Sequence, residues 1–191
     1  MSASKRDELV AKAQDIFYRE GFHATGMDRL VAETGISKTS MYNHFRTKED
    51  LILATLQHRH NELHAQLMAR TEELAKTPKE RILASFDSLK EWIESGEFRS
   101  CMFIKASSEY QDPTHPIHIA AAEHKRSGLR YLAALAEAAG AKEPEVLATQ
   151  LMLLKEGAIV SAHLEGHAGM IEAAKAAAHT LVETAVAAAR L

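Results

Sequence analysis

The sequence predicts an all-α protein of about nine helices, and three observations support this prediction. Alanine and leucine are abundant, whereas only 9 of the 191 residues are glycine, a balance that favours helices over sheets. Proline is absent before Pro78, so the N-terminal part lacks the residue that most often breaks helices. Apolar residues recur every three or four positions in successive segments, as on one face of a helix. We expect a small head, residues 1–47, and a larger helical domain, residues 48–191.

Residues 21–51 contain two short helical patterns on either side of a tight turn. The first begins near Thr25, whose hydroxyl can cap free backbone N–H groups, and carries Leu30 on its apolar face. Gly35 can adopt the left-handed conformation that ends a helix, and Ser37 can cap the next helix. This layout is that of a helix-turn-helix.

The second helix of this pair, residues 38–45, has a polar side suited to DNA. Met41 and Phe45 are four residues apart, which indicates a buried face. Hydroxyl, amide, imidazole and ammonium groups on the other side can contact base edges and phosphates in the major groove. An ordinary surface helix is the alternative, as is a packing role for the aromatic pair at 42 and 44. We expect base contacts from Lys38, Thr39, Ser40 and Asn43, and phosphate contacts from Thr25, Tyr42, His44 and Lys48.

Residues throughout the first fifty positions match a known pattern. They are Ala13, Ile16, Phe17, Gly21, Phe22, Thr25, Leu30, Val31, Gly35, Ile36, Ser37, Met41, Tyr42, His44, Phe45, Lys48, Glu49 and Leu51. Together they resemble the N-terminal domain of the TetR family of one-component repressors. Met41 stands where leucine is usual and Val31 where isoleucine is common. The resemblance implies a three-helix head, a long helix four, and a ligand-binding domain that dimerises through its last two helices.

Charge and composition limit the classes of function. The net charge of −3 argues against general attraction to nucleic acid, but residues 21–48 carry four basic and two acidic side chains. No apolar run approaches the roughly twenty residues that cross a bilayer, and residues 1–19 lack a signal-peptide core. Cys101 is the single cysteine, which excludes a disulfide within the chain and is consistent with a reducing compartment. We expect a cytoplasmic protein without membrane partners.

The chain after residue 48 divides into further helical segments, punctuated by Thr77-Pro78, Gly96, Asp112-Pro113 and Gly140. The expected helices are residues 49–76, 79–95, 101–110, 116–139, 144–165 and 169–190. The last two have dense faces of mostly small and aliphatic residues: Leu147, Leu151, Leu154, Ala158 and Ser161, then Ala174, Ala178, Leu181, Ala185 and Ala188. We expect these faces to form a homodimer interface, with burial within the monomer as the alternative.

The larger domain carries candidate residues for a small-molecule effector. Apolar candidates are Phe86, Leu89, Trp92, Phe103 and Leu151, for which a filled core is the alternative. Polar candidates are Glu109, Tyr110, His124, Glu156 and His163. Carboxylates and imidazoles on neighbouring helices can also bind a divalent metal, which makes Glu109, His124, Glu156 and His163 candidate ligands. Their spacing is not that of a dedicated metal motif, so we expect no required cofactor.

These patterns predict a ligand-responsive repressor. A homodimer would place two recognition helices ~34 Å apart, one turn of double-stranded DNA, and so match a palindromic operator from which the effector releases it. Activation instead of repression is not distinguished by sequence. The chain has no glycine-rich phosphate loop and no G-x-S-x-G motif, so we expect no enzymatic activity. The alternatives are a helical metal-dependent enzyme and a non-catalytic helical adaptor.

Overall fold

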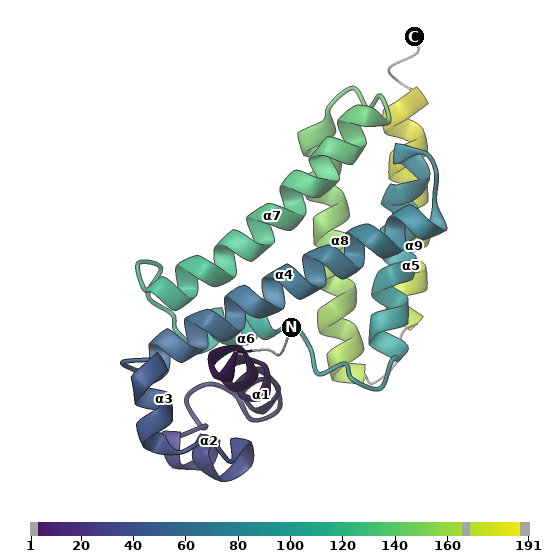
Figure 1. Cartoon of the computed structure of the whole chain (residues 1–191). Coiled ribbons are helices and arrows are strands. Elements are labelled where there is room, and N and C mark those ends of the chain that lie inside the picture. The colour runs from purple at the N-terminus through teal and green to yellow at the C-terminus, as the bar shows by residue number, and fades with distance from the viewer. Residues whose placement is uncertain (1–3, 166–168, 188–191) are drawn as a thin grey trace. The chain divides into compact units, whose positions relative to one another are not determined.

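The computed structural model describes residues 4–165 and 169–187, which form nine α-helices and no strand (Figure 1), as the sequence predicts. The helices are α1 (Lys5–Glu20), α2 (Met27–Thr34), α3 (Lys38–His44), α4 (Lys48–Leu74), α5 (Pro78–Glu94), α6 (Met102–Glu109), α7 (Pro116–Ala138), α8 (Pro144–Glu165) and α9 (Gly169–Ala187). Their bounds lie close to the expected ones. The expected end of the last helix, Arg190, lies outside the described residues.

Local chemistry explains where several helices begin. The Ser4 hydroxyl accepts a hydrogen bond from the Asp7 amide at the start of α1. Helix α5 begins with a capping box, in which Thr77 and Glu80 each accept from the other's backbone amide, followed by Pro78 in the first turn. These interactions satisfy N–H groups that have no partner inside a helix.

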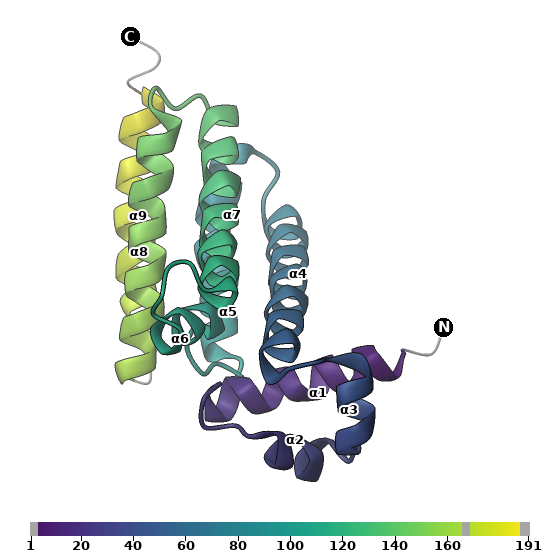
Figure 2. The same ribbon diagram turned by 90° about the vertical axis from the view of Figure 1, so that its left-hand side faces the viewer.

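The helices form two compact units. The first, called the head unit, consists of Met1–Leu63 and Met102–His124, so it contains α1, α2, α3, α6 and the first parts of α4 and α7. Phe17 and Phe22, whose ring centroids are 5.4 Å apart, lie in its core. Figure 2 shows α1, α2 and α3 grouped together. The head unit extends beyond the predicted domain of residues 1–47, and that boundary remains a prediction.

The second unit, called the body unit, consists of His64–Cys101 and Lys125–Leu191. Helices α8 and α9 lie side by side in both views and pack against α5 (Figures 1 and 2). Gly128 of α7 faces α8, since a Cβ at this position would lie 2.9 Å from the methyl carbon at the flexible end of the Met152 side chain. No helix among the described residues is long and apolar enough to cross a bilayer.

The apolar faces expected to form the dimer interface largely face the inside of the body unit. Leu147, Leu151, Ala158, Ala174 and Ala178 are buried in its core. Burial within the monomer, the alternative interpretation, is therefore correct for these five residues. The remaining four described residues of the set, Leu154, Ser161, Leu181 and Ala185, are half-buried, and Ala188 lies outside the described residues.

Candidate nucleic-acid interface

The turn between α2 and α3 has the predicted chemistry. Gly35 ends α2 with a φ of 70°, a left-handed conformation that favours glycine, and its amide donates to the Val31 carbonyl at 3.0 Å. The Thr34 hydroxyl accepts from the Ile36 amide at 3.1 Å. The Ser37 hydroxyl accepts from the Ser40 amide and thereby caps α3. The turn thus fixes where α3 begins.

Helix α3 has one buried and one exposed side. Met41 is 0% exposed and Phe45, just after the helix, is 5% exposed, which confirms the predicted buried face. Ser40 is half-buried, and the other predicted contact residues of this helix are exposed: Lys38, Thr39, Tyr42, Asn43 and His44. Tyr42, at 45% exposure, does not fill the core. The exposed side offers hydrogen-bond groups of the kinds that contact base edges and phosphates.

Lys38 is held at the start of α3 by an ion pair. Its ammonium lies 2.9 Å from the Asp28 carboxylate of α2, and this hydrogen bond raises the pKa of Lys38. Both side chains are exposed, so water screens the pair and DNA can displace it. Lys38 is therefore charged and available at the surface.

Thr25 and Lys48, two predicted phosphate contacts, hold the segment between α1 and α2. Thr25 is buried and does not cap α2, contrary to expectation, because its hydroxyl donates to the Gly21 carbonyl at 2.7 Å. The Lys48 ammonium donates to the carbonyls of Phe22 at 3.0 Å and Thr25 at 3.3 Å. Direct contact of either side chain with phosphate remains a prediction.

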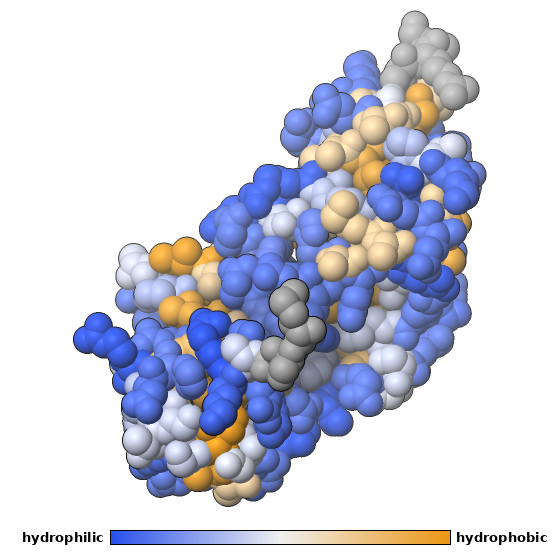
Figure 3. Space-filling model, in the orientation of Figure 1, coloured by the Kyte–Doolittle hydropathy of each residue, from blue (hydrophilic) through white to orange (hydrophobic). Residues whose placement is uncertain are grey.

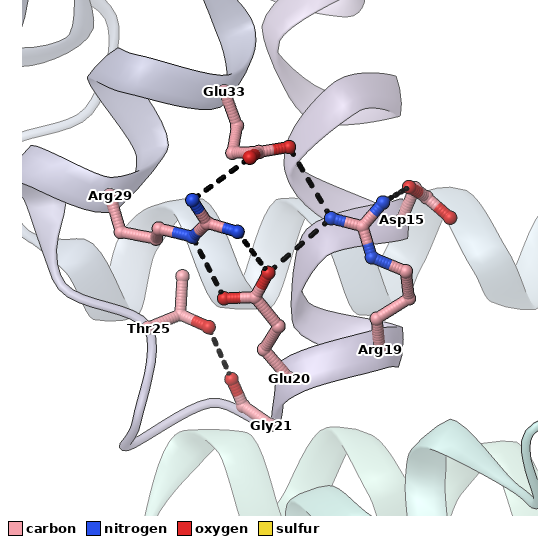
Figure 4. Close-up of polar contacts among 7 residues, drawn as sticks. All are labelled: Asp15, Arg19, Glu20, Gly21, Thr25, Arg29 and Glu33. Carbon is pink, nitrogen blue, oxygen red and sulfur yellow. Dashed lines mark hydrogen bonds and ion pairs between the residues drawn. The ribbon is translucent and has the colours of Figure 1, made fainter.

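Ion pairs join α1 and α2 (Figure 4). The Arg29 guanidinium donates to both oxygens of Glu20, at 2.8 and 3.1 Å, and lies 2.9 Å from Glu33. Arg19 contacts Asp15 at 3.0 Å and both glutamates at 3.4 Å. Hydrogen bonds to arginine lower the pKa of Glu20, which keeps its carboxylate charged. Arg29 therefore serves to position α2.

Glu109, at the end of α6, binds the same segment as Lys48. Its carboxylate accepts from the backbone amides of Phe22 at 3.0 Å and His23 at 2.5 Å. Lys105 of α6 also donates to the Tyr18 carbonyl at 3.0 Å. These three hydrogen bonds connect α6 to the end of α1 and to the segment that precedes α2.

Two further basic residues near α3 were not singled out from the sequence. Arg46 follows α3 directly, is exposed, and forms no ion pair within residues 4–165 and 169–187. The guanidinium of Arg6 lies 4.9 Å from the centroid of the Phe45 ring. Arg46 could have been identified from the sequence, because it is a basic residue directly after the recognition helix.

Two family models match this chain. Residues 9–55 match the model of bacterial regulatory proteins of the tetR family, and residues 78–178 match the tetracyclin repressor-like C-terminal domain. The chain belongs to the TetR family. It is a DNA-binding transcriptional regulator, and the helix-turn-helix described above is its DNA-reading element.

Three curated relatives are HTH-type transcriptional regulators. The chain is 22% identical to the transcriptional regulator YjdC of Escherichia coli over 81% of each protein. It is 32% identical to the activator FasR of Mycolicibacterium smegmatis, over 47% of this chain and 41% of FasR. It is 27% identical to the repressor NemR of Escherichia coli, over 56% of this chain and 54% of NemR.

Solved structures match nearly the whole chain. SCO4454, a TetR-family transcriptional regulator from Streptomyces coelicolor, has a TM-score of 0.82 at 30% identity, with 96% of this chain and 95% of that chain covered. The regulator sav143 from Streptomyces avermitilis has a TM-score of 0.81 at 29% identity, with 96% and 98% covered. The described helices of this chain therefore have the fold of these TetR-family regulators.

The predicted effector residues of this TetR-family chain fall into both units. Phe103, Glu109, Tyr110 and His124 belong to the head unit, where Phe103 stacks on His124 with ring centroids 3.6 Å apart. His124 also lies 3.0 Å from His60, nitrogen to nitrogen. Tyr110 is buried between the rings of His23 and His115, and burial raises its pKa. In the structure these residues make contacts within the head.

The remaining predicted effector residues belong to the body unit. Phe86, Leu89 and Leu151 are buried, which a pocket wall and a filled core would both show, and His163 is exposed. Glu156 forms an ion pair with Lys125, a residue that no sequence pattern indicated. Among the described residues, no three His, Cys, Asp or Glu side chains gather as a metal site, and the four candidate metal ligands do not form one.

Proposed function

We propose that this TetR-family regulator is a repressor that binds a palindromic operator as a homodimer and is released by a small-molecule effector. The observation that carries the proposal is α3, whose apolar side is buried while Lys38, Thr39, Tyr42 and Asn43 are exposed together. Such a helix can enter the major groove without exposing its core residues. The residue assignments are base contacts from Lys38, Thr39, Ser40 and Asn43, and DNA phosphate contacts from Thr25, Tyr42, His44 and Lys48, to which the structure adds the exposed Arg46 as a candidate.

The proposed dimer uses exposed apolar residues of α8. Val146, Leu153, Val160 and Leu164 follow one another at intervals of seven, seven and four residues, so they share one side of the helix. Leu153 is 68% exposed and Leu164 is 78% exposed. By contrast, the face of the protein drawn in Figure 3 is mostly hydrophilic, with apolar residues in separate small areas. A continuous exposed apolar row is typical of a surface that a partner covers.

Helix α9 presents a complementary surface for this dimer. Ala173, Ala177, Thr180 and Thr184 are exposed and lie on one side of the helix at intervals of three and four residues. Small side chains allow a second helix to approach closely. We infer that α8 and α9 of two protomers form an isologous four-helix interface.

Release from DNA requires an effector that prefers one conformation over the other. A shift from 1:99 to 99:1 requires about 5.5 kcal/mol of differential affinity. Within the head, Glu109 connects α6 to α2, because a displacement of α6 acts on the Phe22 and His23 amides that precede α2. We infer that this connection transmits part of the change that moves α3.

Support for repression comes from the family resemblance and from NemR, which is named a repressor, although FasR is named an activator. The named relatives are regulators, so neither the metal-dependent enzyme nor the adaptor is favoured. We infer a non-enzymatic protein, without a required cofactor, that acts in the cytoplasm where its DNA lies.

The proposal is tested by measuring binding of the purified protein to its own upstream DNA, with random DNA as competitor, across a salt series. We expect selective binding with a dimer-sized footprint, and reduced selectivity in Asn43→Ala. Asn61→Ala, which removes an exposed asparagine on α4, is the matched control and should bind like wild type. Equal affinity for upstream and random DNA would contradict the proposal, and a reporter gene distinguishes repression from activation.

A further inference from the structure

The body unit contains two lysines and one carboxylate that lie close together. The Lys125 ammonium donates to both Glu156 oxygens, at 2.7 and 2.8 Å, and lies 3.3 Å from the Cys101 sulfur. Glu156 is next to Lys155 in α8, and the two charges interact. Lys125 and Glu156 neutralise each other, so the group of three carries a net charge of +1 when both lysines are protonated.

Lys155 lacks a carboxylate partner of its own. Its ammonium donates to the Ser85 carbonyl of α5 at 3.2 Å and lies 5.5 Å from the centroid of the Phe86 ring. Within the described part of the chain, no acidic side chain forms an ion pair with it. An ammonium group has three N–H donors, and a single carbonyl satisfies one of them. Burial of this group lowers the pKa of Lys155 to about 8, which reflects the cost of keeping it charged.

A donor without an acceptor lies on the side of α5 that carries Ser85. The indole nitrogen of Trp92 is buried and has no hydrogen-bond partner in the part of the chain that the structure describes. Trp92 is seven residues after Ser85, so the two share a helix side and are separated by ~10 Å along the axis. Its ring packs edge-to-face on Phe98 with centroids 4.8 Å apart. The Lys155 ammonium, at Ser85, and the Trp92 indole N–H therefore lie at the two ends of an apolar stretch of α5 that includes the buried Leu89.

We propose that the body unit binds an organic monoanion, whose carboxylate pairs with Lys155 and whose apolar part lies along α5 toward Trp92. Lys155 is half-buried and has one carbonyl acceptor, so a carboxylate that accepts from its remaining N–H groups offsets part of the cost of desolvating the charge. The net charge of +1 matches a monoanion, whereas the Glu156 carboxylate would oppose a ligand of higher negative charge. This inference rests on the proposed function, because it names the chemical class of the effector.

Two carboxylates of different shape, octanoate and 4-phenylbutanoate, serve as probes, each compared with its uncharged primary amide. Calorimetry on the full-length protein measures affinity, and Trp92 is the single tryptophan, so its emission reports whether a ligand lies beside it. We expect saturable binding of at least one carboxylate with a shift in Trp92 emission. The primary amide of that carboxylate should bind about tenfold more weakly, because the charge-assisted hydrogen bond is lost.

The decisive variant is Lys155→Met, which removes the charge and keeps an unbranched side chain. It should bind the carboxylate about tenfold more weakly and leave affinity for the amide unchanged. Lys175→Met is the matched control, because Lys175 lies at the surface and pairs with Asp87 at 2.5 Å. Circular dichroism verifies that both variants fold.

Proton uptake provides an independent readout. A bound carboxylate raises the pKa of Lys155 above about 8, so at pH 8.5 the wild-type complex should take up protons that calorimetry in two buffers detects. Lys155→Met should take up none. The inference is overturned if neither carboxylate binds saturably, if carboxylate and amide bind equally, or if Lys155→Met retains wild-type carboxylate affinity.

Operator binding without ligand distinguishes this inference from the proposed function. We expect wild type and Lys155→Met to bind upstream DNA equally, and the carboxylate that binds should weaken only the wild-type complex. If the protein binds its operator but neither carboxylate, the inference alone fails. If it fails to bind any DNA selectively, the proposed function fails, whatever the calorimetry shows.

Discussion

The head and body units differ in the polar contacts made beside their proposed binding sites, although each unit has one buried side-chain atom without a partner among the described residues, Gln14 Oε1 in the head and Trp92 Nε1 in the body. In the head, the Thr25 hydroxyl, the Lys48 ammonium and the Glu109 carboxylate all bond to the backbone of the segment between α1 and α2. In the body, the Lys155 ammonium has one carbonyl acceptor and the Trp92 indole has none among the described residues. In the head, the segment before α2 is held by bonds within the protein, whereas the donors beside α5 are the groups that we propose to contact a ligand.

The largest expected effect is on the core of the head. Phe17→Ala should lower the free energy of unfolding by about 3–5 kcal/mol, because Phe17 is fully buried and packs on Phe22. Chemical denaturation measures the loss. Tyr42→Ala, at a half-exposed position of α3, should change the free energy of unfolding by less than about 0.5 kcal/mol. A similar loss in both variants would mean that the head lacks the described core.

The next effect tests the connection from α6 to the segment before α2. Glu109→Ala leaves the Phe22 and His23 amides without their acceptor, so it should cost about 1–3 kcal/mol of stability and weaken operator binding without changing α3. Denaturation and DNA titration measure the two losses. Glu109→Gln keeps one acceptor oxygen and should lie between alanine and wild type. Wild-type operator affinity in Glu109→Ala would show that the head does not need this connection.

Two variants on or next to the exposed side of α3 separate base contacts from phosphate contacts. Asn43→Ala should cost about 1–3 kcal/mol and relax preference at one operator position, since a base contact is lost. Arg46→Ala should weaken binding to all sequences and lower the salt slope by about 1, since a phosphate contact is lost. Titrations of an operator and its single-base variants over a salt series separate these results. If both variants changed base preference and salt slope in the same way, the assignment of Asn43 to a base and Arg46 to a phosphate would be wrong.

The smallest expected effect concerns pH and the body unit. The pKa of Lys155 is about 8 in the folded protein and that of an unfolded lysine is about 10.4, so the unfolded chain binds more protons between these values. Wild type should therefore become more stable relative to Lys155→Met as pH rises from 8 to 10, by about 1–2 kcal/mol after allowance for partial exposure. Denaturant midpoints of both proteins between pH 8 and 10 measure this difference in stability. A constant difference would show that Lys155 is not desolvated.

The features predicted correctly from the sequence depend on neighbouring residues. The three-to-four-residue spacing identified the helices, Gly35 and Ser37 identified the turn, and the interval between Met41 and Phe45 identified the buried side of α3. Each involves residues within one turn or one helix. Local propensity and periodicity are sufficient for such features.

The features missed depend on contacts between distant segments. Glu109 bonds to amides 86 and 87 positions earlier in the chain, and no spacing rule connects such residues. Helices α8 and α9 are apolar on more than one side, so composition did not show that Leu147 and Leu151 face the core while Leu153 faces outward. Periodicity identifies an apolar side but not the surface that covers it.

Selection of bound sequences from random DNA tests the central claim, that two copies of this head read DNA together, most directly. The purified wild-type protein should enrich an inverted repeat whose half-sites lie about one helical turn apart, and Asn43→Ala should enrich a motif degenerate at one position in each half-site. Enrichment of a single unrepeated half-site would contradict the dimer, and the absence of any enriched motif would contradict the assignment of α3 as the DNA-reading helix.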